Sequence, residues 1–290
     1  MKIVITGGAG YVGIPLAVRL LNLGHDLTIL DVLQHGAQPL IPLAANKHCK
    51  IVHTDIRGMG SDRAYWLADV DVIFHLAAIS GYTACEADPG EAWSVNVDGT
   101  RNIVSALSPS QLLIYASTTS IYGPASLYAK TKEAAEQAVM ARQNSISIRW
   151  ATLFGVAPAM RNDLLPNLLV RQAIQRGRLD LFSSHQRRTF MHVQDAAAGY
   201  ILAMDRADEL VGAIWDVGDT GLSCTKRKLA QHIQEHVECE LTEMVQTDQD
   251  ARDIDVDFTP AADKGLAYSS QWSDHLPELV RLYSFYYPEG

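Results

Sequence analysis

The chain has 290 residues, of which 48% are hydrophobic and 20% charged, an ordinary composition for one large α/β domain or slightly more. Its formal net charge of −9 offers no basic surface to nucleic acid or an anionic membrane, and no apolar run approaches the length of a membrane span. The four cysteines are widely spaced without a C-x-x-C pair, so we expect free thiols and a cytoplasmic location. Glycines within the N-terminal apolar stretch argue against a signal peptide.

The first predicted elements enclose a glycine-rich turn. A short apolar run over 2–6 predicts a strand, a helical pattern covers 14–23, and GGAGYVG (7–13) lies between them. In this context G-x-x-G-x-x-G is a dinucleotide-binding fingerprint. Its glycines permit a tight turn, let the backbone approach a pyrophosphate, and let the helix pack closely on the strand. The N–H groups at the start of the helix then face the phosphates. These glycines are Gly7, Gly10 and Gly13.

An acidic residue ends the second predicted strand. Asp31 occupies the place where a carboxylate binds both ribose hydroxyls of NAD. Its charge repels a 2′-phosphate, and no arginine follows it directly, so the pattern favours NAD over NADP. The alternative for Asp31 is a strand-end residue that starts a turn.

Strands and helices continue to alternate along the chain. This order predicts parallel pairing in an α/β fold with a Rossmann-type doubly wound sheet, whose ligand binds at the carboxyl ends of the strands. The further predicted strands are 50–53, 69–76, 111–116 and 145–150, and the further predicted helices are 89–107 and 128–142.

A cluster of hydroxyl residues follows the strand at 111–116. Tyr128 and Lys132 are four residues apart at a helix start, so they share one face. A tyrosine is a poor base at neutral pH, but a neighbouring ammonium favours its phenolate. Thr118 or Ser117 can donate a hydrogen bond to a substrate oxygen that changes between alcohol and carbonyl. The alternative for Y-x-x-x-K is an exposed helix face.

At this point the chain resembles the extended short-chain dehydrogenase/reductase family, in particular its NAD-dependent epimerase/dehydratase enzymes that act on nucleotide sugars. The resemblance covers nearly the whole chain, and the segments that carry it are TGGAGYVG (6–13), DI (55–56), HLAA (75–78), NVDGT (96–100), YASTTSIYG (115–123), YAKTK (128–132), RWATLFG (149–155), RNDLLPN (161–167), RRTFMHVQDAA (187–197) and DARDIDVDF (250–258).

The resemblance implies roles for individual residues. Thr118 matches the catalytic Ser/Thr, Tyr128 the catalytic base, and Lys132 the lysine that holds the nicotinamide ribose and tunes the tyrosine. Asp55 and Ile56 are expected to hold the adenine. The expected cofactor-binding residues are Gly7, Gly10, Tyr11, Val12, Gly13, Asp31, Asp55, Ile56, Leu76, Ala77, Ala78, Ala116, Ser117, Tyr128 and Lys132. Asn96 matches a buried structural asparagine.

The second half of the chain resembles the smaller C-terminal substrate-binding domain of the family. We expect an NAD-binding domain over 1–152, to which the chain returns at about 190–217, and a substrate-binding domain over 153–189 and 218–290. Two arginines match residues that grip the sugar diphosphate, with a surface ion pair as the alternative for each. The expected substrate-binding residues are Thr118, Thr119, Thr152, Asn162, Asp163, Leu164, Arg188 and Arg252.

Two departures from the family pattern refine the expectation. The residues after Thr118 are Thr119, Ser120 and Ile121, without the carboxylate that sugar dehydratases and decarboxylases usually carry there. This favours an epimerase. The connection from Thr118 to Tyr128 is also shorter than in extended relatives, which predicts a wide pocket at the sugar end, provided that no other segment fills the gap.

We therefore expect an NAD-dependent nucleotide-sugar epimerase that acts at C4 by transient oxidation and return of the hydride. A net dehydrogenase or reductase uses the same residues, and a non-catalytic NAD-binding protein is the third alternative. No metal is expected, because H-x-x-E-H at 232–236 lies on a helix with an ordinary apolar face and His75 ends a buried strand. Relatives pair through helices that correspond to about 91–107 and 127–142, so a homodimer is expected.

Overall fold

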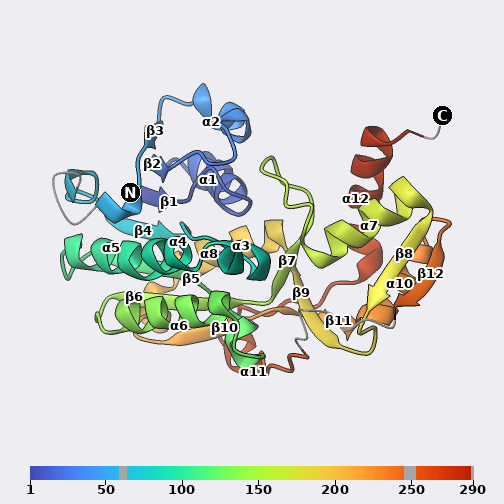
Figure 1. Cartoon of the computed structure of the whole chain (residues 1–290). Coiled ribbons are helices and arrows are strands. Elements are labelled where there is room, and N and C mark those ends of the chain that lie inside the picture. Colours follow the sequence, from blue (N-terminus) through green and yellow to red (C-terminus); the bar gives the residue numbers. More distant parts are fainter. Residues whose placement is uncertain (59–63, 245–252, 289–290) are drawn as a thin grey trace.

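The computed structural model describes residues 1–58, 64–244 and 253–288. Figure 1 shows a larger lobe built on a central sheet and a smaller lobe beside it, with the amino terminus in the larger lobe and the C-terminal helix in the smaller one.

The larger lobe contains a seven-stranded, fully parallel sheet. Its order is β10-β6-β5-β4-β1-β2-β3, so the chain first builds outward from β1 in one direction and then in the other. In sheets of this kind, ligands bind at the carboxyl ends of the strands where the order reverses, which is here between β1 and β4. The strands are β1 (Lys2–Thr6), β2 (Asp26–Asp31), β3 (Cys49–His53), β4 (Val72–His75), β5 (Leu112–Thr118), β6 (Ser145–Trp150) and β10 (Ile214–Val217). The predicted doubly wound sheet is confirmed.

Helices cover both faces of this sheet because successive side chains along each buried strand point to opposite faces. Ile3 and Ile5 pack in one core with α1 and α8, whereas Val4 packs in the other with α5 and α6. The helices of the first face are α1 (Gly13–Asn22), α2 (Ile41–Ala44) and α8 (Val193–Asp205), and those of the second are α4 (Pro89–Trp93), α5 (Thr100–Ala106) and α6 (Leu127–Met140). Shorter elements are η1 (Gln38–Leu40), η2 (Ile56–Gly58), η3 (Ala64–Trp66), α3 (Tyr82–Ala87), η5 (Thr119–Tyr122), α9 (Ala207–Leu210) and α11 (Thr259–Ala262).

The continuous helix predicted over 89–107 is interrupted by a π-helical turn, η4 (Ser94–Gly99), between α4 and α5. Asn96 in this turn is buried, and its side-chain amide bonds both the N–H and the carbonyl of Ile79. It also donates to Thr131 Oγ1 on α6 at 3.0 Å. The π-helical turn thus positions the Asn96 amide so that the amide links the loop after β4 to α6, as expected of a structural asparagine.

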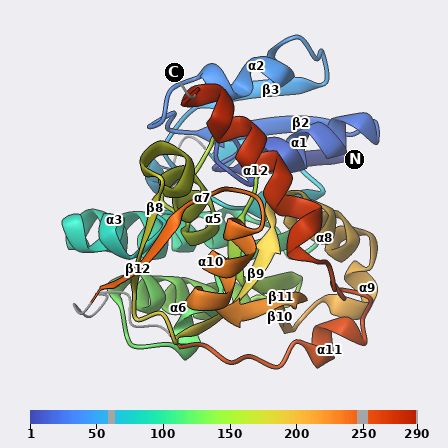
Figure 2. The ribbon, with the colours of Figure 1, turned by 90° about the vertical axis from the view of Figure 1, so that its right-hand side faces the viewer.

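The smaller lobe has its own core between two small sheets and three helices. Phe154, Phe190 and Trp272 meet at its centre. Figure 2 shows α10 and α12 on its outer side. Its sheets are β11-β9-β7, made of β7 (Thr152–Phe154), β9 (Arg187–His192) and β11 (Asp219–Thr225), and β12-β8, made of β8 (Arg178–Phe182) and β12 (Glu240–Met244). Its helices are α7 (Leu165–Arg176), α10 (Lys226–Gln234) and α12 (Trp272–Tyr286).

The chain crosses between the lobes several times. After β9 it returns to the larger lobe through α8 and β10, and it leaves again into β11. Phe258 and Leu266 also pack in the larger core, although they follow β12 in the sequence. The crevice between the lobes is therefore bordered by segments from distant parts of the chain.

Candidate active site

The glycine loop between β1 and α1 is packed so closely that side chains do not fit. Gly7 has a φ of +69°, and a Cβ there would lie 2.6 Å from the backbone nitrogen of Ala77. A Cβ on Gly13 would lie 2.6 Å from the Cα of Gly8, and one on Gly10 would lie 3.0 Å from the carbonyl oxygen of Gly7. The loop therefore forms a compact cradle of bare backbone between the end of β4 and the start of α1, which fits a pyrophosphate.

Asp31 is held at the rim of this cradle. Its carboxylate accepts hydrogen bonds from the backbone N–H groups of Ala9 (3.0 Å) and Leu33 (2.7 Å), one on each oxygen. A carboxylate oxygen can accept more than one hydrogen bond, so both oxygens can also accept from ribose hydroxyls. This arrangement fits the ribose of NAD.

At the end of β3, Asp55 and Ile56 have different surroundings. Asp55 accepts a hydrogen bond from Arg57 Nε at 2.9 Å, and Arg57 also donates to Glu91 at 2.7 Å. The side chain of Ile56 is buried under Gly99, where a Cβ would come within 2.7 Å of it. The π-helical turn and the expected adenine site are thus in direct contact.

Lys132 and Tyr128 lie in the first turns of α6. The helix begins at Ser126, whose side chain accepts from Ala129 N at 3.1 Å. Lys132 is buried, and its Nζ lies 4.1 Å from the centre of the Tyr115 ring. Burial lowers the pKa of Lys132 to about 7, and the nearby Glu136 opposes the shift. Lys132 therefore loses its proton far more easily than a lysine in water.

The predicted hydroxyl cluster lies at the carboxyl end of β5. Thr118 Oγ1 donates to Ser120 Oγ at 3.0 Å and accepts from Ser120 N at 3.1 Å, so Thr118 caps η5. Thr119 Oγ1 donates to the carbonyl of Trp150 at 3.2 Å. Ser117 Oγ is buried and has no hydrogen-bond partner within the described ranges.

A polar network holds the short connection between Thr118 and Tyr128. Arg149 on β6 donates to both Glu136 on α6 and the hydroxyl of Tyr122, at 3.0 Å and 2.6 Å. Tyr122 in turn donates to Asp216 on β10 at 2.8 Å. The connection is thus fastened to two strands and a helix of the larger lobe.

One contact joins the glycine loop to the smaller lobe, and we call it the Tyr11–Asn167 clamp. Tyr11 donates to the carbonyl of Gly155 at 2.6 Å and accepts from Asn167 Nδ2 at 3.2 Å. Asn167 is fully buried, accepts from Gly155 N at 3.0 Å and donates to the carbonyl of Arg161 at 2.9 Å. The sequence analysis did not select Asn167, although a polar residue among the apolar residues of α7 is a visible signal.

Arg161 opens the segment RNDLLPN (161–167), which the resemblance associates with the sugar diphosphate, but the sequence analysis did not select the residue itself. Its Nε and Nη2 donate to Asp163 at 2.7 Å and 2.6 Å, and its guanidinium lies against Gly81, where a Cβ would be 3.4 Å from Nη2. The hydrogen bond to Asp163 raises the pKa of Arg161, and the nearby phenols of Tyr128 and Tyr11 act in the same direction. Arg161 therefore reaches from the smaller lobe to Gly81 in the loop that follows β4. Its signal in the sequence was R-x-D in a turn-rich segment.

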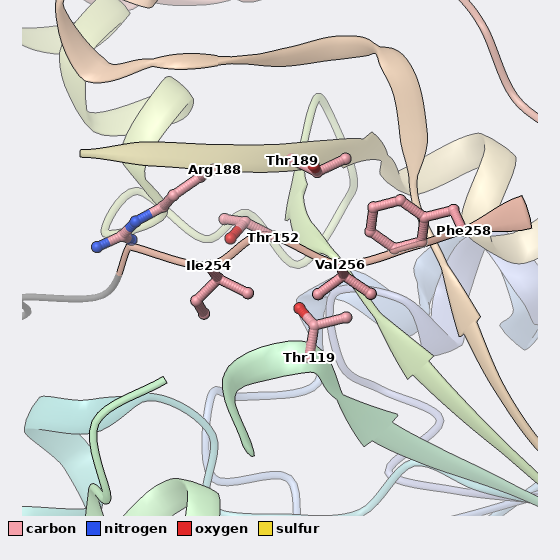
Figure 3. A pocket seen from close by; sticks show the side chains of 7 residues that line it. All are labelled: Thr119, Thr152, Arg188, Thr189, Ile254, Val256 and Phe258. Atoms are coloured by element: carbon pink, nitrogen blue, oxygen red, sulfur yellow. The ribbon is translucent and has the colours of Figure 1, made fainter. Parts of the chain in front are cut away.

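Apart from Thr118, which caps η5, the expected substrate-binding residues of the described ranges fall into two groups. Asn162, Asp163 and Leu164 form one group beside Arg161, with Asn162 accepting from Tyr283 at 2.7 Å. Thr119, Thr152 and Arg188 form the other, around a cavity whose remaining walls are Thr189, Ile254, Val256 and Phe258 (Figure 3). Arg252 lies outside the described residues.

The cavity beside Thr119 lies next to Arg188, the arginine expected to grip the diphosphate, so the wide pocket expected above Thr118 at the sugar end stays a prediction. The cavity beside Thr119 has a volume of about 10 Å³ because the segment 253–258, which we call the strap, runs along β9. Figure 3 shows Ile254 and Val256 of the strap between Thr119 and the strand that carries Arg188. The strap therefore borders the cavity at Arg188 and narrows it.

The comparisons with known proteins agree with this geometry. The model of the NAD-dependent epimerase/dehydratase family matches residues 3–218. The chain belongs to this family.

Individual members of the family differ in activity. The chain is 25% identical over 253 residues to a UDP-glucose 4-epimerase of Corynebacterium glutamicum, covering 75% of each protein. Among solved structures, the UDP-glucuronic acid 4-epimerase of Bacillus cereus, in complex with UDP-glucuronic acid and NAD, has a TM-score of 0.87 at 22% identity and covers 99% of this chain and 100% of that one. An NAD-dependent NDP-hexosamine 5,6-dehydratase of tunicamycin biosynthesis has a TM-score of 0.84 at 20% identity and covers 98% of both chains. The solved structures show the common fold, and the family is NAD-dependent.

The structure also shows the surroundings of two histidines considered in the sequence analysis, His75 and His232. His75 is fully buried, with Nδ1 2.6 Å from Thr6 Oγ1 and Nε2 2.9 Å from Thr100 Oγ1, which confirms it as a hydrogen-bonded core residue. His232 lies on α10, whose Leu229 and Ile233 are buried, and forms a pair with Glu235 at 3.4 Å. In the described part of the chain, no three His, Cys, Asp or Glu side chains are grouped to hold a metal ion, and no helix is long and apolar enough to cross a bilayer.

Proposed function

We propose that the protein is a cytoplasmic NAD-dependent epimerase that inverts C4 of a nucleotide sugar. The observation that carries this proposal is the placement of Thr118, Tyr128 and Lys132 at the carboxyl end of β5 and the start of α6, in the lobe that also holds the glycine cradle. The residues after Thr118 are hydroxylic or apolar, so they offer no acid or base for removing water or carbon dioxide. The larger lobe would bind NAD and the smaller lobe the substrate.

The residues that would hold NAD fit its parts. The cradle accommodates the pyrophosphate, Asp31 the adenosine ribose, and Lys132 the nicotinamide ribose. NAD, when bound, takes up the hydride from the sugar carbon and returns it later. The carboxylate of Asp31 would repel the additional phosphate of NADP.

The chain's own residues move the proton. Tyr128 accepts the proton of the sugar hydroxyl, and the O–H electron pair becomes the second bond of the carbonyl as hydride leaves the same carbon. Thr118 donates a hydrogen bond to this oxygen once its hydroxyl has turned away from Ser120 Oγ. Once the keto-sugar presents its other face, the hydride returns and Tyr128 gives the proton back. The products balance the substrates, so no external oxidant is consumed.

The nucleotide diphosphate would be bound where the lobes meet. Arg188 is buried beside Thr119 and Thr152, and a guanidinium can donate two parallel hydrogen bonds to phosphate oxygens. The strap would have to shift, because the cavity of about 10 Å³ is smaller than a nucleotide. The binding of UDP-glucuronic acid by the Bacillus cereus relative supports this substrate class.

Tyr128→Phe tests the proposal. The variant keeps the ring but loses the proton acceptor, so NAD binding should persist while turnover falls by roughly 10²–10⁴-fold. The assay follows interconversion of UDP-sugar epimers by NMR, with Tyr65→Phe at an exposed position as the matched control. Retention of more than about a tenth of the activity would exclude Tyr128 as the base.

NADH absorbance in the same assay separates the remaining alternatives. An epimerase interconverts the sugars without accumulating NADH, whereas a dehydrogenase accumulates NADH in proportion to turnover. A non-catalytic NAD-binding protein does neither.

A further inference from the structure

Glu278 on α12 binds the same peptide group as the Tyr11–Asn167 clamp. The carbonyl of Gly155 accepts from the Tyr11 hydroxyl at 2.6 Å, and the N–H of this same peptide group, at Val156, donates to Glu278 Oε1 at 2.9 Å. One peptide group therefore links the glycine loop of the larger lobe to the C-terminal helix of the smaller lobe. The proposed proton and hydride transfer does not use Glu278.

His192 holds the carboxylate of Glu278 in place. Its Nε2 lies 2.6 Å from Glu278 Oε1, the oxygen that also accepts from Val156 N. Burial raises the pKa of Glu278, but the hydrogen bonds from His192 and Val156 outweigh it, and the net shift is downward. His192 is itself buried and packs directly against Gly155, where a Cβ would lie 2.2 Å from its Nε2. The imidazole, the carboxylate and the peptide group therefore move together.

The bond from Val156 to Glu278 acts on the clamp through the shared peptide group. An acceptor on the N–H of a peptide draws electron density toward the carbonyl oxygen of that peptide, and hydrogen bonds in such a chain strengthen one another. A carboxylate is a stronger acceptor than a neutral oxygen. Gly155 N also donates to Asn167 Oδ1 at 3.0 Å, which fixes the preceding peptide group. Glu278 therefore both orients and strengthens the carbonyl that Tyr11 binds.

A second imidazole makes this contact sensitive to acid. The ring of His275 stacks on that of His192, with the ring centres 4.5 Å apart and an angle of 14° between the planes. His192 has a carboxylate partner in Glu278, whereas His275 Nε2 is buried without a hydrogen-bond partner among the residues that the structure describes. A proton on His192 is thus paired, but a second proton, on His275, places two cations face to face.

The other charges around His275 do not remove this conflict. Burial, and then the charge of His192, lower the pKa of His275 below its ordinary value of 6.5. The carboxylates that act in the opposite direction are those of Asp195, Asp219 and Asp274. Because the pKa is lower in the intact contact than in an opened one, the opened form binds the second proton more tightly. Acid therefore favours opening of the contact.

We propose that Glu278 is a positioning residue for the clamp and that the stacked imidazoles of His192 and His275 make the clamp sensitive to acid. At neutral pH, Glu278 holds the peptide group of 155–156 toward Tyr11 and so keeps the two lobes joined. A second proton on the imidazole pair separates the rings, frees the peptide group and releases Tyr11. The inference rests on the proposed function in that the larger lobe binds NAD and the smaller lobe a nucleotide.

The test measures NAD affinity by calorimetry with and without UDP. At pH 7, UDP should raise the NAD affinity of the wild-type protein about fivefold or more, a typical size for coupling between two sites. Glu278→Ala should remove this gain, whereas Glu278→Gln should keep most of it, because an amide oxygen can accept the same two hydrogen bonds. Glu235→Ala is the matched control, since Glu235 forms a pair with another histidine, His232, in the same lobe.

The same titrations at about pH 5.5 test the imidazole pair. The gain of the wild-type protein should fall below about twofold. His275→Phe should retain its gain, because a phenyl ring can stack on His192 but cannot bind a proton. His232→Phe, the matched control, should lose the gain in acid as the wild-type protein does. Each gain is a ratio of NAD affinities at one pH, so an effect of pH on NAD binding alone cancels.

The opposite outcomes would overturn the inference. A gain that survives in Glu278→Ala would show that the carboxylate does not position the clamp. If Glu278→Ala does not fold, the comparison in acid decides, and an equal loss of the gain in His275→Phe and the wild-type protein refutes the proposal. Binding of NAD and UDP without any gain at pH 7 would refute the inference and leave the proposed function intact, whereas failure to bind NAD or UDP would refute both.

Discussion

His75 illustrates how the fold controls a single titratable residue. Thr100 Oγ1 donates to the carbonyl of Asn96 at 2.6 Å, so it accepts from the Nε2–H of His75, and Nδ1 accepts from Thr6. This arrangement requires a neutral ring. Burial, with a smaller contribution from the charge of Lys132, lowers the pKa of His75 to about 3 from its ordinary value of 6.5.

This pKa predicts a loss of stability in mild acid. Between pH 6.5 and about 3 the unfolded chain binds a proton at His75 that the folded chain does not, so the free energy of unfolding falls as the pH falls. From pH 7 to pH 5 the contribution of His75 is about 2 kcal/mol. Urea unfolding at pH 7 and pH 5 measures how far the free energy of unfolding falls between the two. This fall should be smaller for His75→Asn than for the exposed control His48→Asn. Equal differences in the two variants would contradict the assignment.

For single residues, the sequence indicated which residues belong to the candidate site better than it indicated which residues they contact. Gly7, Gly13 and Asp31 were predictable because their roles follow from backbone geometry next to a strand end. Arg161 and Asn167 were not, because their partners Gly81 and Tyr11 lie in the other lobe. Only the folded crevice brings these residues together.

At the scale of elements, α6 carries the proposed catalytic residues Tyr128 and Lys132 together with a buried ion pair. Glu136 lies one turn beyond Lys132, is 2% exposed, and accepts from Arg149 and from Ser147 Oγ at 2.7 Å. Removing one partner of such a pair leaves the other charge partly buried and unpaired.

Glu136→Ala should therefore lower the free energy of unfolding by about 3–5 kcal/mol. The matched control is Glu209→Ala, which removes the exposed pair with Arg206 and should change it by less than about 1 kcal/mol. Urea unfolding of both variants at one pH measures the difference. Similar effects would mean that the Glu136–Arg149 pair is as weak as a surface pair.

Some elements could be predicted from the spacing of apolar residues, and others could not. The strands of the large sheet were predictable as short apolar runs, and α6 as a helical pattern. The π-helical turn was not, because apolar residues such as Trp93 and Val97 keep helical spacing through it while the backbone changes hydrogen bonds. The position of the strap was not predicted. Ile254 and Val256 line a cavity formed with distant residues, and the local sequence does not show which residues they contact.

At the scale of the whole molecule, α4, α5 and α6 form one outer layer of the larger lobe (Figure 1). Val95 and Met140 pack partly against their own core, whereas Trp93 is 42% exposed. Ala134 and Ala138 are half-buried small residues on α6, which allow close approach of another helix. This layer is the surface through which we expect two copies to form a closed dimer.

Light scattering should show a dimer at micromolar concentration. Ala138→Arg should shift the protein to a monomer, because the guanidinium obstructs the helix contact, and Gln143→Arg, an exposed position just beyond α6, should not. A wild-type protein that is monomeric under these conditions would refute the expected assembly.

The Tyr11–Asn167 clamp couples the two lobes through one hydroxyl. If ligand binding to one lobe stabilises the clamp, it favours binding to the other by the same factor, because equilibrium coupling is reciprocal. NAD affinity should therefore rise roughly fivefold or more when UDP is present. Tyr11→Phe should remove this gain, while Tyr268→Phe, which loses a longer bond to Asp195, should retain it. Titrations of NAD with and without UDP measure the effect, and an unchanged gain in Tyr11→Phe would disprove the coupling.

Such coupling has a consequence for retention of the coenzyme. While a sugar nucleotide occupies the smaller lobe, the reduced dinucleotide would leave the larger lobe more slowly. The half-reaction would then be trapped until the hydride returns, and the coenzyme would behave as a resident group rather than a diffusing second substrate. The hydroxyl of Tyr11, six residues after Ile5 of β1, would thereby determine how often a catalytic cycle ends before the hydride returns.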